Sequence, residues 1–153
     1  MMKYLLSFSC SVLIAAIVVS VFPVNNEWRI YDDVLRLHVI AESDSDEDQA
    51  LKLKVRDAVL DYVSDKVAEC DNFDDAYAAI DGMKDGIREA AQACVDENGG
   101  NCGVSVLLGR EDYPRRDYGG ASLPAGTYES LRVVLGEGEG HNWWCVLFPS
   151  VCM

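Results

Sequence analysis

The hydrophobic period of this chain changes at Asn98-Gly99-Gly100. In the roughly fifty residues before these glycines the apolar residues recur every three or four positions, which is typical of amphipathic helices. After them apolar and polar residues alternate, which is typical of strands. Helices that precede a group of strands predict an α+β domain, in which a small sheet packs against the helices.

The first helix is expected to begin in the acidic run Asp44-Ser45-Asp46-Glu47-Asp48. Ser45 and Asp48 have the spacing of an N-cap and its reciprocal partner, and acidic residues favour the positive end of a helix. One apolar stripe should face the core and a polar side should face solvent. The stripe consists of Leu51, Val55, Ala58, Val59 and Tyr62, and the polar side of Lys52, Arg56 and Asp61.

The second helix is expected to follow Asn72, which is a favourable N-cap residue. Its apolar positions are Phe73, Ala76, Tyr77, Ile80, Met83, Ile87, Ala90 and Cys94. Gly82 and Gly86 lie in its middle, and each glycine in a helix costs up to about 1 kcal/mol relative to alanine. We therefore expect either a kinked helix or two shorter helices.

Extended runs are predicted on both sides of the helices. Residues 34–41 form a short apolar run with Arg36 and His38 on one face, and later runs lie at residues 104–108, 128–135 and 144–148. Residues 113–126 are rich in turn residues and predict an ordered surface loop. The fold class is therefore α+β, a small and mainly antiparallel sheet with two or three helices on one face.

The N-terminus is a separate apolar segment. Met1-Met2-Lys3 is followed by an almost uninterrupted apolar stretch at residues 4–24. A cleavable export signal usually has an apolar core of about 7–15 residues, and a membrane-spanning helix needs about 20. We expect residues 1–24 to form a signal peptide or a membrane anchor helix, followed by a single exported domain at residues 25–153.

The charge of the chain excludes two classes of partner. Its formal net charge is −13 at pH 7 and it has no basic cluster, which argues against nucleic acid and against an anionic membrane surface. The acidic run does not form a calcium loop of the EF-hand type. If Asp44 opened such a loop, the required glycine would be Gln49 and the closing glutamate would be Val55.

The most informative side chains lie in the run Asn142-Trp143-Trp144-Cys145-Val146-Leu147-Phe148-Pro149. Neighbouring residues of a strand point to opposite faces, so one of the two indoles needs cover beyond a one-sided sheet. The tryptophans either close the core from both sides or serve as anchors for a partner protein. The preceding glycine-rich residues 136–140 are expected to form a mobile connection that presents them.

Catalytic and metal-binding interpretations of this run are weak. Cys145 as a nucleophile with His141 as its base would require contact across four strand residues, which span about 13 Å. His38 stays open as a base because the fold could bring it closer. A metal site made of His141, Cys145 and Cys152 lacks a fourth ligand. We predict no catalytic residue, no metal and no cofactor.

The exported setting favours disulfides. Cys145 and Cys152 are the best local pair, because a turn at Pro149 can bring them together. Cys94 and Cys102 flank the glycine turn and form a second candidate pair, which would leave Cys70 free.

The whole pattern resembles the stage II sporulation protein R family of spore-forming bacteria. The most specific match is the run from Asn142 to Pro149. Other matching segments are Leu35-Arg36-Leu37-His38-Val39-Ile40-Ala41-Glu42-Ser43-Asp44-Ser45, Asp48-Gln49, Val55-Arg56-Asp57-Ala58-Val59, Tyr113-Pro114, Tyr118-Gly119, Pro124-Ala125-Gly126 with Tyr128, and Gly136 with Gly138. The tail Pro149-Ser150-Val151-Cys152 departs from the family, which usually has a second proline and a leucine before the cysteine.

The resemblance implies a signalling protein that is exported into the intermembrane space between forespore and mother cell, either secreted or anchored in the membrane. There it would activate a membrane-embedded aspartic protease that processes pro-sigma-E, as an activator and not as an enzyme. The partner-binding residues it implies are Asn142, Trp143, Trp144 and Phe148, with Arg36, Arg56 and Asp57 as weaker candidates. The alternative is an exported cysteine-dependent hydrolase or redox protein that acts on septal or cell-wall components.

Overall fold

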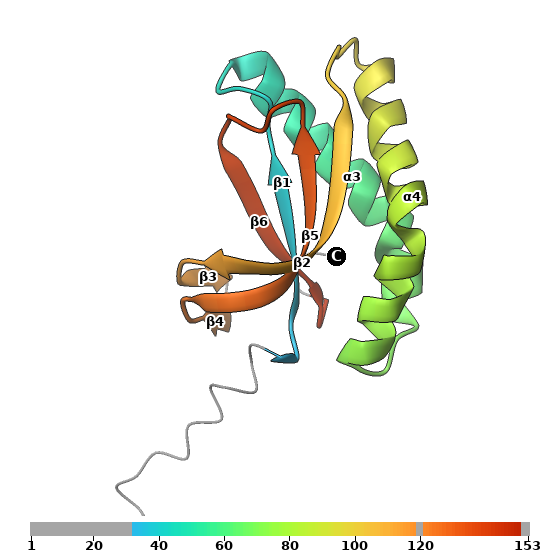
Figure 1. Ribbon diagram of the computed structural model, residues 1–153, viewed down its shortest axis with the longest axis vertical. Helices are drawn as coiled ribbons and strands as arrows, with labels where there is room; N and C mark the ends of the chain where they lie inside the picture. Colours follow the sequence, from blue (N-terminus) through green and yellow to red (C-terminus); the bar gives the residue numbers. More distant parts are fainter. Residues whose placement is uncertain (1–31, 119–120, 151–153) are drawn as a thin grey trace, which may run out of the picture.

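The computed structural model describes residues 32–118 and 121–150 (Figure 1). The expected signal peptide or anchor at residues 1–24 lies outside the described residues, as does Cys152. Within the described part, no helix is both long enough and apolar enough to cross a membrane. The elements are β1 (Leu35–Ile40), α3 (Asp46–Ala68), α4 (Phe73–Glu97), β2 (Val104–Tyr113), β3 (Arg116–Tyr118), β4 (Ala121–Leu123), β5 (Gly126–Leu135) and β6 (Asn142–Phe148).

Four strands form the main sheet, in the order β2-β5-β1-β6. The pairs β2–β5 and β1–β6 are antiparallel, whereas β1 and β5 run parallel. The sheet is therefore mixed and mainly antiparallel, and the α+β fold class is confirmed. β1 lies inside the sheet, and β6 lies at an edge.

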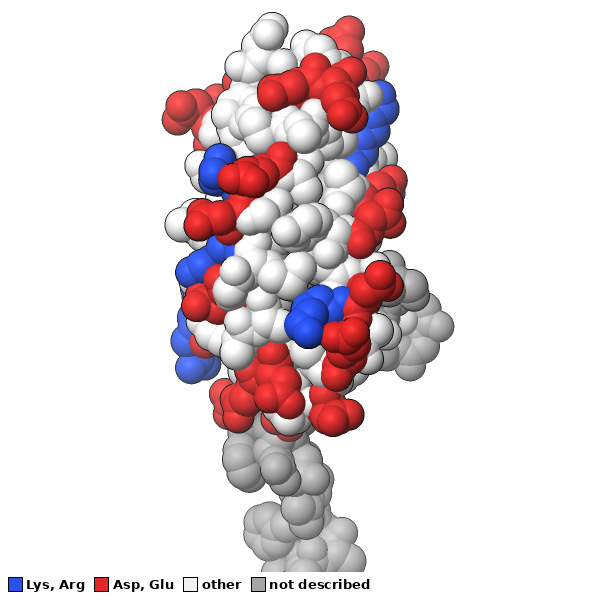
Figure 2. Space-filling model, turned by 90° about the vertical axis from the view of Figure 1, so that its right-hand side faces the viewer, with Lys and Arg blue, Asp and Glu red and all other residues white. Residues whose placement is uncertain are grey.

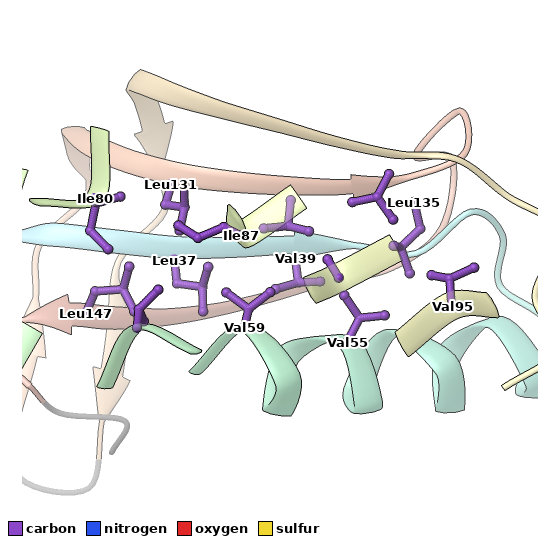
Figure 3. Packing of buried hydrophobic residues seen from close by; sticks show 14 of the residues in the cluster. Leu37, Val39, Val55, Val59, Ile80, Ile87, Val95, Leu131, Leu135 and Leu147 are labelled. Carbon is purple, nitrogen blue, oxygen red and sulfur yellow. The ribbon is translucent and has the colours of Figure 1, made fainter. Parts of the chain in front are cut away.

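Both helices pack on the same face of the sheet, as the sequence predicts (Figure 1). Figure 3 shows valines and isoleucines of the helices pointing toward leucines and valines of the strands. The labelled residues are Val55 and Val59 of α3, Ile80, Ile87 and Val95 of α4, and Leu37, Val39, Leu131, Leu135 and Leu147 of the strands. The solvent side of the helices carries many acidic side chains beside an uncharged stripe (Figure 2).

The two helices begin where the sequence predicts. Ser45 Oγ accepts a hydrogen bond from the backbone N–H of Asp48 at 3.1 Å, and Asn72 Oδ1 accepts one from Asp75 at 3.0 Å. The reciprocal half of the first cap is different from the prediction. The Asp48 carboxylate accepts a hydrogen bond from the Ser43 hydroxyl, and this hydroxyl also accepts the backbone N–H of Ser45.

Two residues of α3 face differently from the predicted pattern. Tyr62, predicted in the core, is 45% exposed and lies against α4 at Gly86, where a glycine leaves space for its ring. Lys52, predicted in solvent, is only 5% exposed. Its ammonium donates hydrogen bonds to Gln49 Oε1 and to the carbonyl of His141, and these acceptors explain how a lysine can be buried here. Burial lowers the pKa of Lys52.

The second helix is continuous, so the expectation of two shorter helices is wrong. α4 spans 25 residues and includes both Gly82 and Gly86. Packing of its apolar face on the sheet outweighs the low helix propensity of two glycines. The helix ends at Glu97 with Asn98 as its C-cap, and the next residue, Gly99, has a φ of +74° that favours glycine.

The segment predicted as a surface loop contains a small hairpin of β3 and β4. Its strands pair from Arg116 with Leu123 to Tyr118 with Ala121. The hairpin projects from the sheet on the side away from the helices (Figure 1). Tyr118 and Leu123 pack there against a second apolar cluster, whose buried members are Val34, Tyr113, Tyr128 and Val146. Burial of these side chains explains why the segment forms an ordered hairpin.

Residues 136–140 are held in place, contrary to the expected mobile connection. The backbone N–H groups of Gly136, Gly138, Glu139 and Gly140 all donate to backbone carbonyls, at 2.9 to 3.1 Å. Two of the acceptors, Ala41 and Glu42, follow β1 directly. The approach is close, because a Cβ atom added to Gly140 would overlap the Ser43 carbonyl oxygen. The start of β6 is thus fixed to the end of β1.

This close approach predicts opposite effects for two glycine substitutions. Gly140→Ala should lower the free energy of unfolding by about 1–3 kcal/mol, because the backbone around Ser43 must move. Gly82→Ala should raise it by about 0.5–1 kcal/mol, because the site is helical and has no atom within 4 Å of the added Cβ. Urea unfolding followed by circular dichroism measures both, and equal effects of the two changes would contradict the packing described.

Candidate partner-binding surface

The edge strand β6 presents the two tryptophans to opposite faces of the sheet. In the pairing with β1, Trp143 lies opposite Val39 and Trp144 opposite His38. Trp143 packs against the core on the helix side, whereas Trp144 joins the apolar cluster on the other face. Each indole is half-buried. Residues of the chain itself therefore cover part of each ring, and the rest of each ring stays exposed to solvent.

On the helix side, the structure brings together several of the predicted site residues. The Arg56 guanidinium lies 4.9 Å from the centre of the Trp143 ring. Arg56 Nε also donates a hydrogen bond of 2.7 Å to the exposed Asp57 carboxylate. Trp143, Arg56 and Asp57 therefore form one accessible surface beside the edge of the sheet. Asn142 is exposed as well, but it directly precedes Trp143 on β6 and lies with Trp144 and Arg116 on the other face.

On the second face, Trp144 stacks among aromatic and charged groups. Its ring centre lies 5.5 Å from that of His38 and 6.4 Å from that of Tyr113. The guanidinium of Arg116, an exposed residue of β3, lies 4.1 Å from the centre of the indole. Arg116 was not predicted from the sequence, because only the hairpin brings it to Trp144.

Arg36 is not part of an exposed surface, because strand alternation places it under the hairpin. It is fully buried. Its guanidinium lies 3.7 Å from the centre of the Tyr113 ring and 4.9 Å from that of Tyr128, and Nη2 donates a hydrogen bond of 2.5 Å to the Tyr118 hydroxyl. Within the described part of the chain, its Nε and Nη1 atoms have no hydrogen-bond partner. Arg36 therefore sits in an aromatic cage.

Phe148 is separated from the other predicted site residues. It pairs with Leu35 at one end of β6, whereas Asn142 pairs with Ile40 at the other end. Phe148 is partly buried against the helix-side core. The register shift between Leu35 and Arg36 lies beside it, and its peptide bond to Pro149 is cis.

A partly buried ionic group lies next to Trp144 on the second face. His38 Nδ1 is 2.9 Å from Glu111 Oε1, and Arg132 Nη1 is 3.6 Å from the same oxygen. Burial alone would raise the pKa of Glu111, but the hydrogen bond with His38 and the charges of His38 and Arg132 outweigh it and lower this pKa. Sequence reasoning missed Glu111, although the alternation of β2 places it on the same face as Tyr113.

Of the two predicted cysteine pairs, one is wrong, and the pair of Cys145 with Cys152 stays a prediction because Cys152 lies outside the described residues. Cys145 is disulfide-bonded and 6% exposed. The other described cysteines, Cys70, Cys94 and Cys102, are free thiols, so the suggested pair of Cys94 with Cys102 is wrong. Cys94 lies in α4, whereas Cys102 precedes β2, and burial raises the pKa of both thiols.

His141 has a structural contact that explains its position. Its backbone N–H donates to Asp44 Oδ1 at 2.6 Å, and its Nδ1 contacts the same oxygen. The side-chain hydrogen bond of His141 lowers the pKa of Asp44. The imidazole is thus directed to the loop before α3. In the described ranges, no three His, Cys, Asp or Glu side chains lie close enough together to hold a metal ion.

The chain is an α+β protein with an aromatic and charged surface on an edge strand. Residues 31–153 match the model of the family described as stage II sporulation protein R, and the chain belongs to this family of sporulation proteins. Stage II sporulation protein R of Bacillus subtilis (strain 168) is 38% identical over 128 residues, which cover 84% of this chain and 57% of that protein. The chain thus spans little more than half the length of this relative. No solved structure matches it.

The lowered pKa of Glu111 predicts an acid-sensitive contribution to stability. The ionised carboxylate stabilises the fold above its unfolded pKa of about 4.3, and this contribution is lost as the pH falls through the lower folded pKa. Glu111→Gln should lower the free energy of unfolding at pH 7 by about 1–3 kcal/mol. Between pH 7 and pH 3 the variant should lose less stability than the wild type. Urea unfolding at both pH values tests this, with the exposed Glu137→Gln as control.

Proposed function

We propose that this protein is an exported signalling protein of sporulation that activates a membrane-embedded aspartic protease, which then processes pro-sigma-E. Membership of the stage II sporulation protein R family supports this assignment. In the proposal the protein acts as a ligand for the protease and not as a catalyst. It works in the intermembrane space between forespore and mother cell, secreted or anchored through residues 4–24.

The observation that carries the proposal is the pair of half-buried indoles on β6. Tryptophan and arginine are the side chains most often found at the energetic centre of protein interfaces. Trp143 with Arg56 and Trp144 with Arg116 provide two such groups on the two sides of one edge strand. A partner that contacts both faces of this edge strand would bury the remaining exposed part of both rings.

The alternative of a cysteine-dependent hydrolase or redox enzyme has less support. A nucleophilic cysteine must be an accessible thiolate. Cys145 is almost fully buried and disulfide-bonded, and the nearest histidine in the sequence, His141, is engaged with Asp44. These features favour a structural role for Cys145, in which its disulfide stabilises the strand that carries the tryptophans.

The direct test is cleavage of pro-sigma-E in a non-sporulating bacterial host. The host produces pro-sigma-E and the membrane protease, with or without this protein exported across its membrane. Cleavage that requires the exported protein supports the proposal. If no cleavage occurs although both proteins are present and correctly placed, the proposed function is wrong for this pair.

The same assay tests the indole surface. Trp143→Ala and Trp144→Ala should each reduce cleavage at least tenfold, because hot-spot truncations cost about 2 kcal/mol or more of binding energy. Leu107→Ala is the matched control, since Leu107 is 48% exposed and lies on β2 at the other edge of the sheet. Exported amounts are measured by immunoblot. Full cleavage with both tryptophan variants, at normal exported levels, would remove β6 from the proposed interface.

Replacement of the disulfide cysteine separates a structural role from a catalytic one. Cys145→Ser should lower the thermal midpoint and the exported amount together, because loss of a disulfide typically costs about 2–5 kcal/mol. The activity per exported molecule should remain within about twofold of the wild type. A variant that folds and is exported normally but has no activity would instead indicate chemistry at Cys145.

A further inference from the structure

Two shallow hollows meet at Trp144 on the second face of the sheet. Their volumes are about 400 Å³ and 280 Å³. Arg116, Asn142 and Trp144 line both of them, so the hollows form one groove along the first half of β6, here called the Trp144 groove. One end of the groove lies at Glu139, and the other end at Tyr118.

Some charged side chains of the groove have ionic partners within the protein and others have none. The Asp44 carboxylate is engaged with His141, and Asp117 lies 3.9 Å from Arg115. Arg116 stacks on Trp144, and no described carboxylate lies within 4 Å of its guanidinium. The Tyr118 end of the groove therefore offers a cation that lacks an anionic partner in the described part of the protein.

A second cation lies directly behind the same end of the groove. Arg36 is fully buried, and among the described residues its Nε and Nη1 atoms have no hydrogen-bond partner. A buried guanidinium normally binds carboxylates or several other acceptors. Here Nη2 donates to the hydroxyl of Tyr118, a residue that itself lines the groove. The Tyr118 hydroxyl thus stands between the groove and an incompletely satisfied cation.

We propose that the Trp144 groove binds an extended segment of the partner protein through a carboxylate. The carboxylate interacts with Arg116 and replaces the Tyr118 hydroxyl on Arg36, while the apolar part of the segment lies on Trp144. This inference rests on the proposed function and adds the chemistry of the contact. A second copy of this chain is a poorer occupant, because two bodies that each carry a charge of −13 repel one another.

The first test compares the same charge change at two arginines, one inside the groove and one outside it. Arg116→Glu should reduce capture of the detergent-solubilised protease, and cleavage of pro-sigma-E, about tenfold or more. Arg110→Glu makes the same change of charge at an exposed residue of β2, outside the groove lining and at the other edge of the sheet, and should leave both within about twofold. If the wild type supports cleavage and Arg116→Glu does so equally well, the groove is not the contact, although the proposed function stands.

A second measurement does not depend on the protease. The full chain is titrated with an acetylated and amidated heptapeptide of valine and threonine that has one central glutamate, and with its glutamine twin, while tryptophan fluorescence is followed. The glutamate peptide should bind at least fivefold more tightly, and Tyr118→Phe should tighten its binding further. Equal binding of the two peptides would overturn the inference, as would self-association of the chain that blocks the groove.

Discussion

The position of β1 inside the sheet is the constraint on which the rest of the structure depends. β1 pairs with β5 on one side and with β6 on the other, and its side chains are buried on both faces of the sheet, under the helices on one face and under the hairpin and the second apolar cluster on the other. Leu37 and Val39 meet the helices, which is the ordinary use of an apolar strand face. Arg36 and His38 point to the other face and are buried as well. Polar groups that are buried in this way need acceptors or aromatic faces, and these must come from other elements.

The second face of the sheet supplies these partners from segments far apart in the sequence. Arg36 lies against tyrosines from β2, β3 and β5, and His38 lies against Glu111 and Trp144. The hairpin is part of this arrangement, because its Tyr118 provides the hydroxyl that accepts from Arg36. The buried His38 likewise needs an aromatic neighbour, and Trp144 packs against its imidazole. The partly exposed indole is therefore held by the core of the protein, and it is not a side chain on a flexible loop.

Local signals in the sequence predicted most of the elements, because periodicity and capping depend on residues a few positions apart. Ser45 and Asn72 cap their helices, and alternation placed Trp143 and Trp144 on opposite faces. The errors concern contacts between distant segments. Lys52 is buried because its acceptor, His141, lies 89 residues away in the sequence. Arg116 and Glu111 reach Trp144 and His38 only through the order of the strands, which no local pattern encodes.

Several independent contacts hold the start of β6 in place, and this order affects the free energy with which the strand can bind a partner. Backbone hydrogen bonds join residues 139 and 140 to the end of β1, Lys52 donates to the His141 carbonyl, and Asp44 accepts from the His141 backbone. A surface that is already ordered loses little conformational entropy on binding, so more of its contact energy appears as affinity. The two indoles then supply apolar area in fixed positions, and the arginines stacked on them determine which charges a partner must carry.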